Sequence, residues 1–362
     1  MGERECSLEG VAMIDHAFWK GKRVFITGHT GFKGTWLSNI LSLIGADITG
    51  YSLAPPTKPS LYEITETEKR IHSIDGDIRD KDRLVSIVKE LKPEIVFHLA
   101  AQPLVRQSYK QPVITYEINV MGTVNILEAI RNVSSVRSFV NVTTDKVYEN
   151  KEWYWGYREN ENLCGFDPYS NSKSCSELIT YSYRNSFFNT SEAPAISTAR
   201  SGNVIGGGDY AEDRIIPDCV RAAVADKDII VRNPQSIRPY QHVLECISGY
   251  ILLAQKQYIE KNLAGSYNFG PNDDSCVSTG ELVSLFCNAW QGVKWKVQSD
   301  YGPHEATFLK LDCSKAKMVL GWRPKWSIKT AVEKTVEFYK CNTNIEKAKC
   351  LERQIYQYFN DK

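Results

Sequence analysis

Short apolar runs alternate with longer amphipathic ones along most of the first 204 residues. The short runs suit buried strands of a parallel sheet, and the longer ones repeat apolar residues at intervals of three and four, which is typical of helices. The expected strands are residues 23–27, 47–53, 71–78, 95–101, 138–144 and 195–204, and the expected helices include 33–44, 81–91 and 114–132. Repeated strand–helix–strand units predict an α/β fold with a doubly wound parallel sheet.

The pattern changes after residue 204, where Gly206, Gly207 and Gly208 form a loop and prolines become frequent. We therefore expect a first domain over residues 18–204 and a smaller C-terminal lobe built from residues 205–242 and 259–345. Residues 243–258 are again an amphipathic helix, which we expect to pack on the sheet. The second lobe would then interleave with the first domain.

The charge balance and the distribution of apolar residues exclude several classes of protein. With 44 Lys+Arg against 43 Asp+Glu, the net charge of +1 does not suit a nucleic-acid binder, which needs clustered positive charge. No stretch reaches the ~18 uninterrupted apolar residues of a membrane helix. Residues 1–22 lack the apolar core of a secretory signal, so we expect a cytoplasmic protein. The ten cysteines lack metal-ligand spacing, so we expect reduced thiols and no metal site.

Three glycines mark the turn between the first strand and the first helix. Gly28, Gly31 and Gly34 follow residues 23–27 directly, and glycines at such a turn let the backbone approach a pyrophosphate that the helix N-terminus then binds. The spacing G-x-x-G-x-x-G departs from the usual G-x-G-x-x-G. The strand before the turn and the helix after it nevertheless favour dinucleotide binding over an ordinary turn.

The positions that would contact the adenosine half of a dinucleotide do not distinguish NAD from NADP. The end of the second strand holds Tyr51, Ser52 and Leu53, so neither a carboxylate for a ribose hydroxyl nor an arginine for a 2′-phosphate stands there. The residues leave NAD and NADP both open. Asp77 and Ile78, after the third strand, are placed to bind the adenine amine and to cover its ring, although Asp77 could instead be a helix N-cap.

A tyrosine and a lysine four residues apart follow Pro168 on an expected helix. Tyr169 and Lys173 therefore share one helix face, where the ammonium group could lower the tyrosine pKa and make the phenol a base. Spacing alone is weak, since Tyr358 and Lys362 repeat it at the end of the chain. The preceding strand ends in Thr143, Thr144, Asp145 and Lys146, which brings a hydroxyl, a carboxylate and an amine to the edge where such sheets bind ligands.

Taken together, these motifs resemble the extended short-chain dehydrogenase/reductases, and within them the nucleotide-sugar 4,6-dehydratases. The motifs are G-H-T-G-F-K-G from Gly28, H-L-A-A-Q from His98, T-T-D-K-V-Y from Thr143, Y-S-N-S-K from Tyr169 and R-S-G-N-V-I-G from Arg200. Most relatives have Thr-Asp-Glu where this chain has Thr144, Asp145 and Lys146, and that lysine points to the members that act on CDP-glucose.

The resemblance implies a Rossmann-like domain with bound NAD and a C-terminal lobe that binds the nucleotide sugar. It assigns the cofactor to Tyr169, Lys173 and a set of residues at the strand ends: Gly28, Thr30, Gly31, Phe32, Gly34, Asp77, Ile78, Leu99, Ala100 and Ala101. It assigns the substrate to Asn203, Arg238 and Asn268. It also implies a homodimer or homotetramer that pairs through residues 114–132 and the Tyr169 helix.

The resemblance further implies the steps of the reaction. Tyr169, with Thr144 and Lys173, would take the proton of the sugar C4 hydroxyl while C4 is oxidised. Asp145 would protonate the departing 6-hydroxyl, which requires a raised pKa. Lys146 would act at C5, either as a base that is neutral part of the time or as a cation that stabilises the enolate. The product is a 4-keto-6-deoxy sugar nucleotide, a precursor of the dideoxysugars of surface polysaccharides.

Two alternatives compete with a dehydratase. A nucleotide-sugar 4-epimerase needs the tyrosine and lysine but no acid/base pair for elimination, and Asp145 followed by Lys146 argues against it. A non-catalytic dinucleotide sensor would keep the glycine turn but has no need of Thr144, Tyr169 and Lys173 together. His98 and His242 lie in apolar patterns and are expected to be packed histidines.

Overall fold

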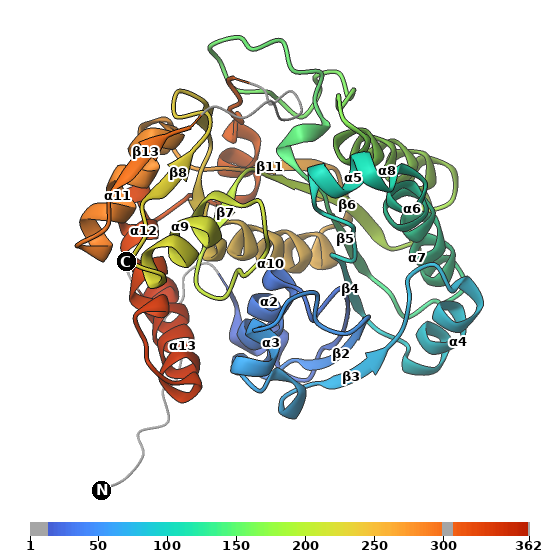
Figure 1. The fold of residues 1–362 in the computed structure, drawn as a ribbon. Coiled ribbons are helices and arrows are strands. Elements are labelled where there is room, and N and C mark those ends of the chain that lie inside the picture. The colour runs from blue at the N-terminus through green and yellow to red at the C-terminus, as the bar shows by residue number, and fades with distance from the viewer. Residues whose placement is uncertain (1–13, 299–306, 361–362) are drawn as a thin grey trace, which may run out of the picture.

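The computed structural model describes residues 14–298 and 307–360 and contains one large parallel sheet (Figure 1). The seven strands lie in the order β3-β2-β1-β4-β5-β6-β11, and every neighbouring pair is parallel. Their bounds are β1 Arg23–Thr27, β2 Asp47–Ser52, β3 His72–Asp75, β4 Ile95–His98, β5 Ser138–Val142, β6 Ala195–Ser201 and β11 Ser266–Phe269. This Rossmann-like, doubly wound arrangement confirms the predicted fold class.

Helices cover both faces of the sheet, and the strands divide their side chains between two cores. Val24 and Ile26 point into a core under α2 (Phe32–Leu43) and α10 (Val243–Ile259), whereas Phe25 points into the core under α4 (Lys81–Leu91) and α7 (Gly122–Arg131). This alternation follows from the period of two along a strand. Both faces are apolar, which is why the strands appear in the sequence as continuous apolar runs.

Several expected strands extend beyond the real ones at their carboxyl ends. The chain leaves the sheet after His98 and after Val142, so Leu99 and Thr143 begin loops. Their apolar and hydroxyl side chains continue the strand pattern, but they line the edge where a ligand would bind. The expected helix over residues 114–132 is also divided, into α6 (Pro112–Tyr116), a π-helical segment (Glu117–Met121) and α7. π-Helical turns of this kind are frequent at functional sites.

The rest of the chain adds a smaller lobe above the carboxyl edge of the sheet. It contains three two-stranded pairings, β7 (Val204–Ile205) with β10 (Gln241–His242), β8 (Ile229–Val231) with β13 (Trp295–Val297), and β9 (Ile237–Arg238) with β12 (Val277–Ser278). Its helices are α9 (Ile215–Val224), α11 (Thr279–Trp290) and α12 (Ile328–Tyr339), and α13 (Asn344–Asn360) follows. The remaining elements are α1 His16–Trp19, α3 Leu61–Ile64, α5 Val105–Lys110, α8 Pro168–Ser186, the 3₁₀ turns Thr67–Lys69, Asp145–Val147, Lys261–Leu263 and Asp273–Ser275, and the π-helical segment Ala316–Leu320.

The two parts of the chain are interleaved. α10 packs on α2 and β5, and β11 extends the main sheet by pairing with β6, although it lies within the range 259–345 that we assigned to the second lobe. That range cannot be a lobe throughout. Residues 1–13, 299–306 and Lys362, which the sequence analysis also drew on, lie outside the described residues. Of the helices in residues 14–298 and 307–360, none has both the length and the apolar character needed to cross a membrane.

Candidate active site

One large cavity lies at the carboxyl edge of the main sheet, beneath the second lobe. Its volume is about 1550 Å³, well above the roughly 300–1,000 Å³ of an ordinary small-molecule pocket. The glycine turn, the ends of β4 and β5 and the first turns of α8 form one wall, and residues 203–217 and 230–240 contribute the other. The cavity is large enough for two ligands side by side.

The glycine turn fits a bound pyrophosphate. Gly28 has φ +78°, and a Cβ there would lie 2.7 Å from the Ala100 nitrogen. A Cβ on Gly34 would lie 2.1 Å from the Gly28 carbonyl oxygen, whereas one on Gly31 would meet only that oxygen, at 3.5 Å. Gly31 is the N-cap of α2 and offers no side chain to cap the helix, so the first-turn amides face the cavity as an anion site. The packing of the fold therefore leaves room for a side chain at position 31.

At one edge of the cavity, β2 contacts the residues that follow β3. The Tyr51 hydroxyl donates to the Asp77 carbonyl oxygen at 3.0 Å, and Asp77 and Ile78 line the cavity. Asp77 is not a helix N-cap, because Asp80 caps α4. Hydrogen bonds from Arg79 hold the pKa of the Asp77 carboxyl below its usual range.

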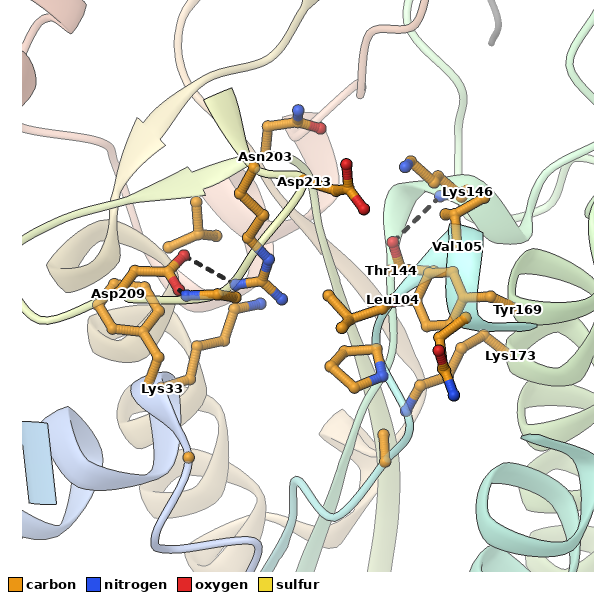
Figure 2. Close-up of a pocket in the computed structure, with 18 of the residues that line it drawn as sticks. Lys33, Leu104, Val105, Thr144, Lys146, Tyr169, Lys173, Asn203, Asp209 and Asp213 are labelled. Atoms are coloured by element: carbon orange, nitrogen blue, oxygen red, sulfur yellow. Dashed lines mark hydrogen bonds and ion pairs between the residues drawn. The ribbon is translucent and has the colours of Figure 1, made fainter. Parts of the chain in front are cut away.

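α8 carries Tyr169 and Lys173 into the cavity from its first two turns (Figure 2). Asp167 caps the helix by accepting from the Ser170 N–H at 3.0 Å, and Pro168 occupies the first turn, where its missing N–H costs nothing. The Lys173 ammonium group donates to the Val142 carbonyl oxygen at 3.1 Å. The Lys173 side chain is thereby fixed against the end of β5.

The two pKa values do not follow the expected pattern. Burial raises the pKa of Tyr169 to about 12, against the opposing effects of a hydrogen bond with Thr144 and the charge of Arg214. Burial also lowers the pKa of Lys173 to about 8, and the neighbouring Lys33 adds to this effect. The prediction that Lys173 lowers the tyrosine pKa is therefore wrong for the protein alone. Desolvation of the phenolate dominates, and Lys173 is turned toward the main chain.

Asp145 is a buried carboxyl and not part of a surface ion pair. It is 1% exposed, its Oδ1 accepts from the Thr144 hydroxyl at 3.0 Å, and its Oδ2 has no hydrogen-bond partner among the described residues. Burial raises its pKa, while the charges of Lys146, Arg238 and Lys33 oppose the rise. A carboxyl in this setting is suited to hold a proton and to donate it.

Lys146 lies one residue further along the same short turn. Its side chain lines the cavity and is half-buried, and its backbone N–H donates to Thr144 Oγ1 at 3.4 Å. The full burial that a neutral lysine base would need is therefore absent. The structure thus brings Thr144, Asp145, Lys146, Tyr169 and Lys173 to one wall of one cavity.

Two of the three expected substrate residues line the cavity, and the third does not. Asn203 and Arg238 line the cavity on the side of the second lobe. Asn268 does not. It is fully buried in β11, where its Oδ1 accepts from the Tyr148 hydroxyl at 2.7 Å and its amide nitrogen donates to the carbonyl oxygens of Tyr157 and Asp312. The assignment of Asn268 to the substrate is corrected, because every polar atom of its side chain already joins β11 to neighbouring loops.

Sequence reasoning missed several charged groups of the cavity. Lys33, inside the glycine turn, reaches the end of β6 and donates to Ser201 Oγ at 3.0 Å. Asp209 and Arg214, in the loop after β7, form an ion pair at 2.8 Å (Figure 2). Lys33 was visible in the sequence as the one lysine of the turn G-H-T-G-F-K-G. Asp209 and Arg214 follow no strand of the main sheet, so no sequence rule located them.

The two histidines are packed. His98 Nδ1 and Nε2 lie 2.7 and 3.4 Å from the hydroxyls of Thr27 and Thr123. His242 lies against Trp36 and Trp326, and its Nδ1 accepts from the Leu244 N–H, but its Nε2 has no partner among the described residues. Burial lowers both pKa values to about 3. Neither ring lines the cavity, and no group of side chains suited to a metal ion occurs in the described ranges.

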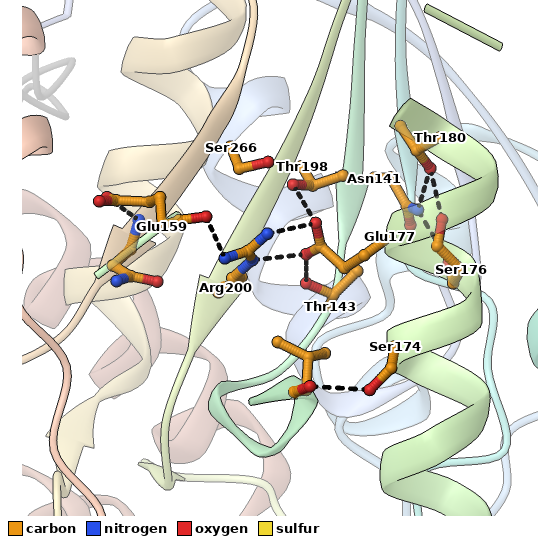
Figure 3. A network of polar contacts seen from close by, with 12 residues as sticks. Asn141, Thr143, Glu159, Ser174, Ser176, Glu177, Thr180, Thr198, Arg200 and Ser266 are labelled. Atoms are coloured by element: carbon orange, nitrogen blue, oxygen red, sulfur yellow. Dashed lines mark hydrogen bonds and ion pairs between the residues drawn. The ribbon is translucent and has the colours of Figure 1, made fainter. Parts of the chain in front are cut away.

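A buried polar network holds α8 against the sheet behind the cavity (Figure 3). Glu177, one turn beyond Lys173, pairs with Arg200 of β6 at 2.8 Å and accepts from the hydroxyls of Thr143 and Thr198. Arg200 also donates to the Tyr148 hydroxyl at 2.8 Å. The carboxylate has a donor on each side, so the network fixes α8 and the ends of β5 and β6 relative to one another.

The glycine turn, the tyrosine–lysine helix and the parallel sheet define the class of the extended short-chain dehydrogenase/reductases. Residues 25–335 match the family model described as GDP-mannose 4,6 dehydratase, and the chain belongs to this family. It is 49% identical over 355 residues to the CDP-glucose 4,6-dehydratase of Salmonella typhimurium, covering 96% of this chain and 99% of that protein. It is 26% identical to the UDP-glucose 4-epimerase of Mycolicibacterium smegmatis, covering 88% of this chain and 98% of the epimerase.

The fold likewise matches solved structures. The dTDP-glucose 4,6-dehydratase of Bacillus anthracis, in complex with NAD, superposes with a TM-score of 0.74 at 21% identity, covering 89% of this chain and 97% of that one. The resemblance stated from the motifs is confirmed.

Proposed function

We propose that this protein is an NAD-dependent hydro-lyase that converts CDP-glucose to CDP-4-keto-6-deoxyglucose. The observation that carries the proposal is the joint placement of Asp145 and Lys146 beside Tyr169 and Lys173 in a cavity large enough for a dinucleotide and a sugar nucleotide. The 49% identity with the Salmonella CDP-glucose 4,6-dehydratase supports the choice of substrate. NAD, when bound, accepts a hydride from C4 of the sugar and returns it to C6.

The wall formed by α8 and β5 serves the oxidation at C4. The Tyr169 phenol oxygen takes the proton of the C4 hydroxyl, with the Thr144 hydroxyl as its hydrogen-bond partner. Tyr169 acts in its phenolate form, which becomes a neutral phenol as it accepts this proton, and Lys173 adds positive charge on the same wall of the cavity. The glycine turn and the free amides at the N-terminus of α2 hold the dinucleotide pyrophosphate.

Asp145 and Lys146 serve the elimination of water. A ketone at C4 makes the C5 proton acidic. That proton passes to a water molecule. Asp145, whose pKa is raised by burial, donates its own proton to the C6 oxygen, and the C6–O bond breaks as the C5–H electron pair forms the C5=C6 bond. Since Lys146 is only half-buried, its proposed role is that of a cation that stabilises the enolate. Arg238, which points toward the same region, is suited to bind phosphate oxygens of the substrate.

We propose that two copies pair through the helices beside the cavity. The face formed by α6, the following π-helical segment and α8 exposes large apolar side chains, namely Val113, Ile114, Met121, Leu178 and Tyr181. A second copy that covers them gives a homodimer, and a homotetramer if dimers pair again.

The nine cysteines among the described residues are free thiols, which suits a reducing cytoplasm. The product belongs to the class from which deoxysugars of surface polysaccharides are made.

The test is incubation of the purified protein with CDP-glucose and NAD. The expected product is CDP-4-keto-6-deoxyglucose, identified by mass spectrometry and by the absorbance of 4-keto sugars in alkali. Deuterium placed at C4 of the substrate is expected at C6 of the product. A 4-epimerase would give CDP-galactose without loss of water, and a sensor would give no product, so either result would overturn the proposal.

A further inference from the structure

Lys33 carries a positive charge in the first turn of a helix, where such a charge is unfavourable. It lies at the N-terminal end of α2, where the helix dipole disfavours positive charge. Its ammonium group nevertheless leaves the glycine turn and donates to Ser201 Oγ at 3.0 Å, at the end of β6, while lying 5.9 Å from the centre of the Tyr250 ring. Ser201 is in turn 2.6 Å from the Tyr250 hydroxyl. Two buried partners from other elements therefore hold this lysine.

The end of β6 is also where Asp145 lies. A Cβ on Gly202, the residue after Ser201, would lie 2.9 Å from Asp145 Oδ2, the oxygen that has no partner among the described residues. The Lys33 charge acts on Asp145 and also lowers the pKa of Lys173. The ammonium group and the proposed catalytic acid therefore both lie at the end of β6, beside the neighbouring residues Ser201 and Gly202.

We propose that Lys33 is a positioning residue of the elimination step, which stabilises the carboxylate that Asp145 becomes when it gives its proton to the leaving hydroxyl. This inference rests on the proposed function. In that step the C5 proton passes to a water molecule, the C5–H electron pair forms the C5=C6 bond, and the C6–O electron pair leaves as water with the proton that Asp145 gives to the C6 oxygen. A buried carboxylate is then left with one unpartnered oxygen, and a fixed cation nearby lowers the cost of forming it.

Other charges surround the two groups, and the inference requires that Lys33 is not redundant with them. The groups that face Asp145 are Lys146, Arg238, Tyr169 and Lys33, and those that face Lys33 are Asp209, Arg214, Cys246, Lys173 and Asp145. Arg214 is already paired with Asp209. Lys146 has its proposed role at C5. Lys33 differs from both, because it donates to the neutral Ser201 hydroxyl and its charge acts on Asp145.

The test compares Lys33→Met with Lys33→Arg and uses two leaving groups. With CDP-glucose, Lys33→Met is expected to lower kcat by about tenfold or more with little change in KM, since each unit of pKa corresponds to a tenfold change. In Lys33→Met the Asp145 carboxylate loses a favourable charge, so the pKa of Asp145 rises. Because Asp145 must be protonated to act, the high-pH limb of the kcat profile then moves to higher pH. Lys33→Arg is expected to restore most of the rate.

The 6-fluoro analogue of CDP-glucose separates a role through Asp145 from a general defect. Fluoride leaves with little help from an acid, so the loss caused by Lys33→Met is expected to shrink to less than about threefold. Lys315→Met is the matched control, because Lys315 is also half-buried, donates to a β11 carbonyl oxygen and lies 4.3 Å from a tyrosine ring, but lies away from the cavity. It should keep the parent kcat and pH profile.

The outcomes are distinct. An equal loss with both leaving groups, an unchanged high-pH limb, or a loss explained wholly by weaker NAD binding in calorimetry would overturn the role of Lys33. If Lys33→Met does not fold, Lys33→Gln, which keeps a hydrogen bond to Ser201 without the charge, is expected to show the same leaving-group dependence. If the parent protein itself makes no 4-keto product, the proposed function fails and not this inference alone.

Discussion

Burial drives three ionisable groups of the cavity toward their neutral forms. The pKa of Tyr169 rises to about 12, that of Lys173 falls to about 8, and that of Asp145 rises. For the acid this is the state that the chemistry needs. For the tyrosine it is the opposite, so a further positive charge must enter the cavity before the phenol becomes a usable base.

The positively charged ring of oxidised NAD is that charge, and we predict that its binding lowers the Tyr169 pKa. The measurement is the absorbance of tyrosinate during an alkaline titration, taken as the difference between the parent protein and Tyr169→Phe. Without NAD the difference should titrate near 12, and with NAD it should move to lower pH. No movement would mean that the ring of Tyr169 does not face the nicotinamide.

Tyr169→Phe is predicted to lower kcat by about 10²–10⁴-fold, the usual range for loss of a general base. Thermal unfolding should change little, because the ring stays in place and only one hydroxyl is lost. Tyr116→Phe is the matched control: its hydroxyl donates to the Asn171 side chain at 2.9 Å, and its ring does not line the cavity. A Tyr169→Phe protein with the parent rate would remove the tyrosine from the mechanism.

At the scale of elements, the sequence predicts the helices and strands whose bounds depend on residues close together in the chain. β1 and α4 have the predicted bounds, because apolar periodicity, the Asp80 cap and the glycine turn act within a few residues. The π-helical segment within residues 114–132 was not predicted. There Asn119 exchanges hydrogen bonds with Gln102 and donates to Ser172, and Gly122 packs on Ile78, so contacts distant in sequence set the local geometry.

The glycine turn gives a prediction with an internal control. Gly31→Ala should fold with a stability within about 1 kcal/mol of the parent, since its Cβ meets only the Gly28 oxygen at an ordinary 3.5 Å. Its affinity for NAD in calorimetry should fall at least about tenfold, because the methyl group occupies the approach of the pyrophosphate. Gly34→Ala should instead lose stability, since its Cβ would lie 2.1 Å from that same oxygen. Equal NAD affinity for parent and Gly31→Ala would place the pyrophosphate elsewhere.

The buried ion pair behind α8 predicts that removing its carboxylate lowers stability much more than breaking an exposed ion pair does. Glu177→Ala leaves Arg200 charged and 2% exposed, which should cost about 3–5 kcal/mol in the free energy of unfolding. Glu128→Ala breaks an ion pair of similar length, 2.7 Å, but Arg131 there is 44% exposed, so the cost should be below about 1 kcal/mol. Denaturant unfolding measures both. Similar costs for the two variants would show that the Glu177 pair does not fix α8.

At the scale of the whole molecule, the sequence located one wall of the cavity but indicated only Asn203 and Arg238 on the other. Thr144, Asp145 and Tyr169 were predictable because the carboxyl ends of parallel strands meet at one edge. Asp209 and Arg214 come from a loop of the second lobe, and only the packing of that lobe on the sheet brings them to the site. Asn268 was misassigned for the same reason: β11 enters the main sheet, so its asparagine serves the fold.

The same long-range packing ties the end of the chain to the core through Glu245. This fully buried carboxyl of α10 accepts from the Tyr358 hydroxyl of α13 at 2.6 Å and from the backbone N–H groups of Lys325 and Trp326. Those donors favour the carboxylate, yet burial outweighs them and raises the pKa to about 7 from the ordinary 4.5. The folded state therefore binds this proton more tightly than the unfolded state does.

Stability should consequently fall as pH rises from about 5 to 8, because the folded protein must then ionise a buried group. The contribution is present below the unfolded pKa of 4.5 and is lost as pH passes the folded value of about 7, a loss of roughly 2–3 kcal/mol. Glu245→Gln cannot ionise, so its unfolding free energy should vary less over this range by that amount, whereas Glu90→Gln, on an exposed position of α4, should follow the parent. A parent and a Glu245→Gln protein with parallel pH profiles would show that the three donors keep Glu245 ionised, and that α13 is held to the core by a permanent charge.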